Sequence, residues 1–163
     1  MQGLKAVDLK LEVIVLPVSD TERAKAFYEK LGLRLDLDTG PSDEFRGVHF
    51  TPPGSGCSIM FGEGMTAAAP GSVQGLYLIV SDIEAARREL RERGIDVSDV
   101  FHDAGGVLFH GHEGGDVTHR APGQQRLAGR HPQGNSYSSF ATFADPDGNG
   151  WVLQEITERF PGR

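Results

Sequence analysis

Two stretches of this chain, 62 residues apart, repeat the same pattern. Val18-Ser19-Asp20 aligns with Val80-Ser81-Asp82, and the glycines at 32 and 94 follow each tripeptide at the same distance. In both copies an apolar run precedes the tripeptide, and a segment with the apolar spacing of a helix follows it. The repeat therefore predicts an internal duplication, in which two halves of a 163-residue chain share one structural unit.

Each copy contains signals for the start and the end of a helix. Ser19 and Glu22 have the spacing of a capping box, and Ser81 and Glu84 repeat it. In that arrangement the serine oxygen accepts a hydrogen bond from an N–H of the first helical turn. The glycine near the end of each copy marks the helix end, because glycine enters the left-handed region freely. One helix is therefore expected in each half.

Short apolar runs around the two helices predict strands. They cover 11–18, 33–38, 46–51 and 58–61 in the first half, and 75–80, 96–101, 138–144 and 151–157 in the second. The motif DPDGNG (145–150) joins the last two strands, and its Asp-Gly and Asn-Gly pairs are typical of a tight hairpin. We expect one domain, 1–163, with a first module at 9–62, a linker at 63–74, and a second module at 75–158 that contains a long glycine-rich loop, 103–135.

Composition narrows the classes of partner. The net charge of −7 argues against nucleic acid, which needs a basic surface. The single cysteine, Cys57, allows no disulfide within one chain and fits a cytoplasmic location. The apolar run near the N-terminus is short and contains Glu12, which argues against a signal peptide or a membrane span.

Three segments together resemble one known group of proteins. They are VSDTERAKAFYEKLGL (18–33), VSDIEAARRELRERGI (80–95) and FADPDGNGWVLQEI (143–156). They are similar to the vicinal oxygen chelate superfamily, which includes glyoxalase I, extradiol dioxygenases, and fosfomycin- and bleomycin-resistance proteins. The resemblance implies an α+β fold, in which two tandem βαβββ modules form curled mixed sheets around a cleft with helices outside. It also implies a homodimer.

The same resemblance implies where metal-using members hold their ion. One ligand lies seven residues before the aspartate that begins the first helix, and a second lies seven residues before the aspartate that begins the second helix. A third lies three residues after the asparagine of DPDGN. Here these positions are Val13, Gly75 and Val152. None of these side chains can bind a divalent cation. We therefore expect no metal and no other cofactor, and glyoxalase or dioxygenase chemistry is not expected to transfer.

Strand alternation predicts the remaining residues of the cleft. If Val152 faces the cleft, so does Gln154, and by the same reasoning Tyr77 accompanies Gly75. Trp151 then belongs to the core, and Glu155 points to the opposite face, toward the helices or solvent.

Two more candidates, His49 and Met60, lie on central strands of the first half. A mostly apolar cleft with a few polar groups is typical of a small-molecule site.

The stretch FHDAGGVLFHGHEGGDVTH (101–119) holds four of the six histidines. Three interpretations remain open: a metal site, a solvated loop with incidental histidines, or a lid whose His102, His110 and His112 contact a ligand. Their spacing matches no tight zinc signature.

The function expected from these observations is metal-independent binding of a small organic molecule, in the manner of the glyoxalase/bleomycin-resistance type. The alternative is a glyoxalase- or dioxygenase-like enzyme, a lyase, isomerase or oxygenase, that uses loop histidines or non-standard metal ligands. A third possibility is an accessory module whose cleft binds a partner chain. Neither nucleic acid nor a membrane is an expected partner.

Overall fold

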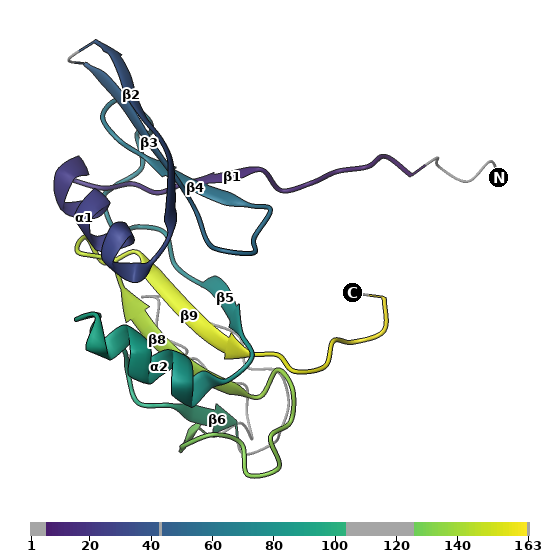
Figure 1. The fold of residues 1–163 in the computed structure, drawn as a ribbon. Helices are drawn as coiled ribbons and strands as arrows, with labels where there is room; N and C mark the ends of the chain where they lie inside the picture. The colour runs from purple at the N-terminus through teal and green to yellow at the C-terminus, as the bar shows by residue number, and fades with distance from the viewer. Residues whose placement is uncertain (1–5, 43, 104–125, 163) are drawn as a thin grey trace.

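A computed structural model describes residues 6–42, 44–103 and 126–162. The first half contains β1 (Val13–Val15), α1 (Thr21–Leu31), β2 (Arg34–Ser42), β3 (Phe45–Thr51) and β4 (Ser58–Phe61) (Figure 1). Its four strands form one sheet in the order β1-β4-β3-β2, and β1 is parallel to β4.

The second half repeats this arrangement with one strand more. It contains β5 (Leu76–Val80), α2 (Ile83–Glu92), β6 (Phe101–Asp103), β7 (Arg126–Ala128), β8 (Ser139–Ala144) and β9 (Gly150–Glu155). The sheet has the order β5-β9-β8-β6-β7, and β5 is parallel to β9. The predicted α+β class with two similar modules and mixed sheets is confirmed. None of the described helices is long and apolar enough to span a membrane.

The helix ends are as expected, but the capping residues are not. Gly32 and Gly94 have φ of 97° and 84°, the left-handed conformation that favours glycine. At the start of each helix, the capping side chain is Asp20 or Asp82 and not the preceding serine. It accepts a hydrogen bond from the backbone N–H three residues later. Ser19 instead donates from its backbone N and its hydroxyl to the carboxylate of Asp147. The capping-box assignment to serine was therefore wrong by one residue.

The predicted strand at 96–101 was mostly wrong, because residues 96–100 form no strand. Ser98 makes only a partial ladder with Thr142: its N–H donates to the Thr142 carbonyl, and its hydroxyl accepts from the Thr142 N–H. The carbonyls of Val97 and Ser98 accept from the guanidinium groups of Arg91 and Arg87 on α2. Arginine side chains thus take the acceptors that a neighbouring strand would need.

The long loop expected at 103–135 also contains a strand that the sequence did not indicate. β7 pairs with β6 in antiparallel register, with Phe101 opposite Ala128. Residues 104–125 lie outside the described part of the chain.

The two modules share one buried core. It includes Leu16, Phe50 and Phe61 from the first module and Phe143 and Leu153 from the second. Trp151 is 3% exposed and belongs to this core, as predicted.

A buried polar network in that core links α1 to the DPDGNG hairpin. The Tyr28 hydroxyl donates to Asp145 at 2.9 Å and accepts from the Trp151 indole at 3.1 Å. The Asn149 amide donates to Asp145 at 2.8 Å and to the carbonyl of Pro17 at 2.9 Å. The hairpin motif therefore connects the second module to the first as well as turning the chain.

Candidate functional site

On the first sheet, the face opposite the core carries three of the predicted site residues. His49 lies opposite Met60 in the β3–β4 pair, and Met60 lies opposite Val15 in the β1–β4 pair. Val13 therefore shares their face by alternation. The Nε2 atom of His49 is buried and has no hydrogen-bond partner among the described residues. Buried polar atoms are usually satisfied, so an unpartnered one on this face is a point where a bound group could attach.

The corresponding face of the second sheet is aromatic. Tyr77 lies opposite Val152, and Phe140 lies opposite Gln154 on one side and Phe101 on the other. Phe101, Phe140 and Val152 form a buried cluster separate from the main core, with Tyr77 packed against it. We call these four residues the aromatic face. The Phe101 and Phe140 rings stack at 5.7 Å between centroids, and the guanidinium carbon of Arg126 lies 3.7 Å from the Phe101 centroid.

Gln154 lies on the predicted side of β9, but its amide is already engaged. The Gln154 Nε2 donates to the carbonyl of Tyr137 at 3.0 Å, and the side chain is buried. Tyr137 has φ of 69°, a conformation that no other non-glycine residue of the described chain adopts. Because such a backbone persists only where its surroundings hold it, Gln154 has a structural role next to the aromatic face.

The residues at the family's metal positions do not fit a metal ion. Val13 and Val152 offer only hydrocarbon side chains, and Gly75 has none. The nearby carboxylate, Glu155, points to the opposite face, as predicted. There it is 1% exposed and accepts from the backbone N of Ile83 at 3.0 Å and from Arg130 at 2.7 Å. Within the described residues, no group of three or more His, Cys, Asp or Glu could hold a metal.

The histidine-rich stretch is only partly described, because His110 and His112 lie outside the described residues. His102 belongs to β6 and is buried, with its Nδ1 2.7 Å from the carbonyl of Gly129. It is therefore fixed in a sheet, and the expectation that it belongs to a lid was wrong.

His131, which carried no signal in the sequence, is also buried. Its ring lies edge-to-face with His102 at 5.6 Å, and its Nδ1 accepts from the backbone N–H groups of Gln133 and Asn135. Only the folding of 129–135 onto β8 brings the two histidines together, since the backbone N of His131 donates to Ser139.

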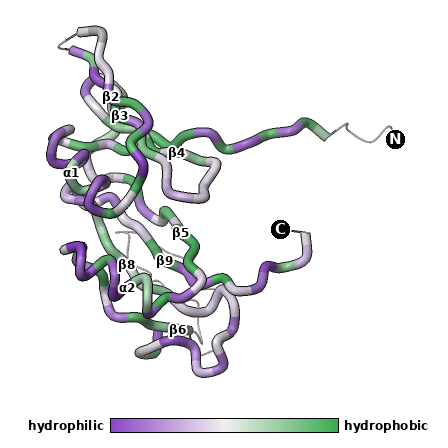
Figure 2. Tube along the Cα trace, in the orientation of Figure 1, coloured by the Kyte–Doolittle hydropathy of each residue, from purple (hydrophilic) through white to green (hydrophobic). Residues whose placement is uncertain are grey.

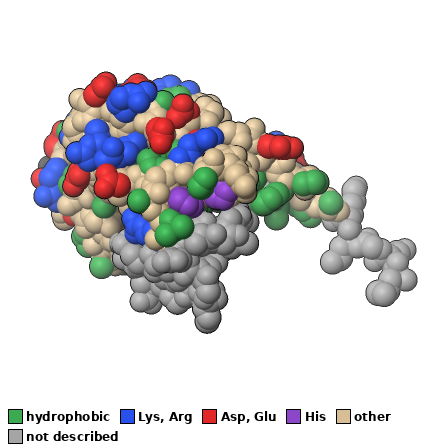
Figure 3. Space-filling model, turned by 90° about the horizontal axis from the view of Figure 1, so that it is seen from below, with side chains coloured by type: hydrophobic (Ala, Val, Ile, Leu, Met, Phe, Trp, Pro, Cys, Tyr) green, Lys and Arg blue, Asp and Glu red, His purple; other side chains and the backbone are tan. Residues whose placement is uncertain are grey.

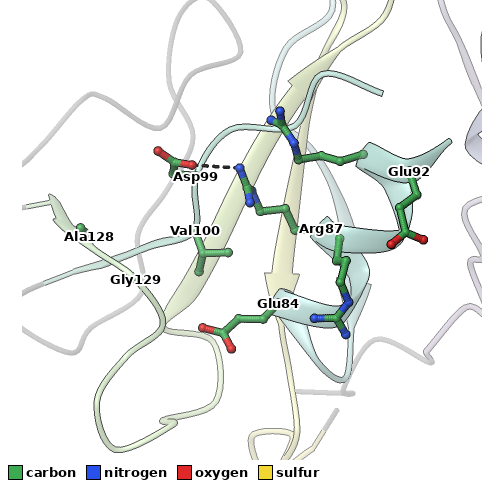
Figure 4. Close-up of a pocket in the computed structure, with 9 residues that line it drawn as sticks. Glu84, Arg87, Glu92, Asp99, Val100, Ala128 and Gly129 are labelled. Atoms are coloured by element: carbon green, nitrogen blue, oxygen red, sulfur yellow. Dashed lines mark hydrogen bonds and ion pairs between the residues drawn. The ribbon is translucent and has the colours of Figure 1, made fainter. Parts of the chain in front are cut away.

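Two hollows in the described surface differ in character. The larger, about 820 Å³, lies against α2 and is lined by charged residues of both signs (Figure 4). Arg87 in it is paired with Asp99 at 2.9 Å. Mixed and partly paired charges give this hollow no preference for a ligand of one sign.

The smaller hollow, about 320 Å³, lies between the first strand of each module. Its described lining includes Gly75 and Tyr77 but none of the other predicted site residues that the structure describes. Gly75 has φ of 74°, so a side chain there would strain the backbone even though no atom lies within 4 Å of the place that its Cβ would take.

Comparisons with known proteins agree with this fold. Residues 10–110 match the model of the Glyoxalase/Bleomycin resistance protein/Dioxygenase superfamily. TnmS3, an antibiotic binding protein from Streptomyces sp. CB03234, is 26% identical, with a TM-score of 0.63, 93% of this chain covered and 99% of that one. A glyoxalase/bleomycin resistance protein from the same organism is 27% identical, with a TM-score of 0.58 and coverages of 89% and 99%.

A superfamily member from Sphaerobacter thermophilus DSM 20745 is 26% identical, with a TM-score of 0.59 and coverages of 91% and 98%. The search of curated proteins found no match.

Proposed function

Because the chain belongs to the Glyoxalase/Bleomycin resistance protein/Dioxygenase superfamily, we propose that it binds a small organic molecule, without a metal, at the aromatic face of its second sheet. The composition of that face carries the proposal. A sheet face that meets only water usually carries polar side chains. This one carries Phe101, Phe140 and Val152, which are at most 3% exposed and form an apolar cluster of their own, with the partly buried Tyr77 at its border.

The chemistry of the aromatic face favours a ligand with a planar ring. Aromatic pairs contribute about 0.5–1.5 kcal/mol beyond their area burial, and Phe101 and Phe140 already stack on each other. Tyr77 packs against the cluster, and the guanidinium of Arg126 lies over the Phe101 ring, so the cluster has polar residues beside it. The likeness to TnmS3, an antibiotic binding protein, supports a small-molecule ligand.

Metal independence rests on residue type. The positions that supply metal ligands in the family are Val13, Gly75 and Val152 here, and among the described residues no group of three or more His, Cys, Asp or Glu replaces them. Val13, His49 and Met60, on the first sheet, stay predicted ligand contacts.

The test is a thermal-shift screen of the protein against a panel of aromatic antibiotics, with and without EDTA. A ligand at about 100 times its dissociation constant adds roughly 2.7 kcal/mol, which raises the Tm of a chain of this size by roughly 5–10 °C. For a hit, Phe101→Leu should abolish most of the shift and Tyr77→Phe should reduce it. Phe160→Leu is the control, because Phe160 is an aromatic residue outside the aromatic face.

Mass spectrometry of the recovered ligand separates binding from catalysis. An unchanged mass supports a binding protein, whereas a converted ligand would assign an enzyme. Binding that disappears in EDTA and returns with a divalent ion would refute metal independence.

A further inference from the structure

A β-bulge in β2 brings a carboxylate onto the face of the first sheet opposite the core, which we call the outer face. The register moves from Leu35 to Leu37 across consecutive residues of β3, so Asp36 is the extra residue. Hydrophilic and hydrophobic residues alternate along the start of β2 (Figure 2), and the bulge interrupts this alternation. Bulges re-aim side chains, and here the Asp36 carboxylate accepts a hydrogen bond from Thr51 of the outer face.

Three side chains, Asp36, Thr51 and Ser58, form a hydrogen-bonded row across the outer face, which we call the polar row. Thr51 shares this face with His49 by alternation along β3, and the Ser58 Oγ on β4 lies 2.7 Å from the Thr51 Oγ1. At the β2 end, Arg34 pairs with Asp36 at 2.6 Å. Thr51 and Ser58 are 5% and 8% exposed, so these two hydroxyls depend on each other for their hydrogen bonds more than on water.

The carboxylate at one end sets the direction of every hydrogen bond in the polar row. Hydrogen bonds from Arg34 and Thr51 hold the pKa of the Asp36 carboxyl below its usual range, so near neutral pH this carboxylate only accepts. The single proton of the Thr51 hydroxyl is therefore given to Asp36, and Thr51 must accept from Ser58. Since the Ser58 proton is used in turn, the Ser58 Oγ keeps acceptor capacity but has no proton left to donate.

This arrangement does not suit a nucleophilic serine. Such a serine needs a neighbouring base that takes its proton, and a carboxylate whose pKa is held low is a weak base. The polar row instead orients a hydroxyl, because it commits the Ser58 Oγ to accepting.

The neighbours of the polar row on the outer face are apolar and partly exposed. Val13 lies opposite Ser58, and Val15 lies opposite Met60; all but Ser58 are half-buried. The buried Nε2 of His49, without a hydrogen-bond partner among the described residues, lies on the same face. Elsewhere, on the surface seen in Figure 3, acidic and basic side chains are interspersed, and such a surface favours no single ligand chemistry. The outer face instead combines hydrocarbon with one oriented acceptor, as small-molecule sites do.

We propose that the outer face of the first sheet binds the hydroxyl group of a small apolar molecule, which donates its hydrogen bond to the Ser58 Oγ. A neutral donor fits better than an ammonium group, because Asp36 is already paired with Arg34. An ether or ketone oxygen, which only accepts, would face an acceptor and leave both groups without a partner, and this mismatch gives the selectivity. The inference goes beyond the proposed function, because the aromatic face belongs to the second sheet.

NMR of methionine methyl groups in the intact protein measures binding at this face. The chain has three methionines, and the spectrum of Met60→Leu identifies the signal of Met60, which lies opposite His49 on the outer face. Phenol and anisole are titrated separately, and the shift of the Met60 signal gives a Kd for each probe. Phenol carries a hydroxyl donor, whereas anisole has the same ring and an oxygen that only accepts. The ratio of the anisole Kd to the phenol Kd therefore measures the preference for a donor.

Ser58→Ala should lower this ratio roughly three- to tenfold, which is the value of one neutral hydrogen bond. Thr51→Val should lower it as well, because Ser58 then keeps its proton and can either donate or accept. Ser55→Ala is the matched control, since Ser55 is an exposed serine whose hydroxyl bonds to the backbone of Cys57. It should leave the ratio within about twofold of the parent.

A Ser58 hydroxyl with a structural role alone would change both dissociation constants alike and leave their ratio as in the parent. That result in Ser58→Ala and Thr51→Val overturns the proposal, and if one of the two variants does not fold, the ratio in the other decides. A Met60 signal that neither probe shifts up to its solubility limit overturns it too. The aromatic face is tested separately by the effect of Phe101→Leu on the thermal shift, so either proposal can fail without the other.

Discussion

Replacing Tyr28 by phenylalanine isolates the hydrogen bonds that join the two modules. The Tyr28 side chain is fully buried, and its ring packs against Phe61 and Trp151 at 5.5 and 6.1 Å. Phenylalanine keeps that ring and opens no cavity. The substitution removes only the hydroxyl, which donates to Asp145 and accepts from Trp151.

The two lost hydrogen bonds set the size of the expected decrease in the free energy of unfolding. A hydrogen bond to a charged group contributes about 1.5–3 kcal/mol, and a buried N–H left without an acceptor costs about 1–3 kcal/mol. Asp145 keeps the amide of Asn149 and the backbone N–H groups of Asp147 and Asn149, so its own loss is partly compensated. We therefore expect Tyr28→Phe to lower the free energy of unfolding by about 2–4 kcal/mol and the Tm by roughly 5–15 °C.

Urea unfolding followed by tryptophan fluorescence measures this value, since Trp151 is the only tryptophan. Tyr137→Phe is the matched control. It also removes a tyrosine hydroxyl, but one whose hydrogen bond to the described part of the chain is a 3.3 Å bond accepted from the backbone N of Phe160. The control should cost less than about 1 kcal/mol. A Tyr28→Phe variant no less stable than the control would refute the role of the network.

Alkaline pH gives a second readout of the same side chain. Burial, with the Asp145 carboxylate nearby, raises the pKa of Tyr28 well above its usual range. Its contribution to stability is therefore complete below the unfolded pKa of about 10 and is lost as the pH rises above that value. Above pH 10 the free energy of unfolding of Tyr28→Phe should fall less steeply than that of the parent, by up to about 1.4 kcal/mol per pH unit. Equal slopes would show that Tyr28 ionises in the folded protein.

Two further predictions concern charged groups. In urea titration, Arg130→Met should lower the free energy of unfolding by about 2–3 kcal/mol, because it leaves the buried Glu155 carboxylate without its cation. This loss is smaller than that for breaking a fully buried ion pair, since Arg130 is partly exposed. Arg34→Met, which breaks an exposed pair, should change it little. Hydrogen bonds from Arg46 and Lys25 hold the pKa of Asp38 below its usual range, so its contribution is present above about pH 4 and is lost on acidification. Asp38→Asn should therefore lose less stability than the parent between about pH 5 and pH 2.

Local patterns determined most of the fold. Apolar spacing placed both helices, and period-two alternation put Trp151 in the core and Glu155 on the helix side of β9. The same alternation placed Tyr77 and Val152 on one face, and the pairing of β5 with β9 sets them opposite each other. These predictions depend on the phase of side chains along a single strand or helix, which neighbouring residues set.

Hydrogen-bond partners were decided by the tertiary structure. Ser19 was free to cap α1 in the sequence pattern, but Asp147, 128 residues away, takes its hydroxyl, and Asp20 caps the helix instead. Of the strand expected at 96–101, residues 96–100 form no strand, and Arg91 and Arg87 take the carbonyls of Val97 and Ser98.

The candidate site divides in the same way. The residue types at positions 13, 75 and 152 already argued against a metal. The pairing of His102 with His131, the engagement of Gln154 by Tyr137, and the stack of Phe101 on Phe140 required the folded chain. Each joins residues on different segments, and a polar group or ring takes whichever partner the packing of those segments brings within reach, which no periodicity along one segment can encode.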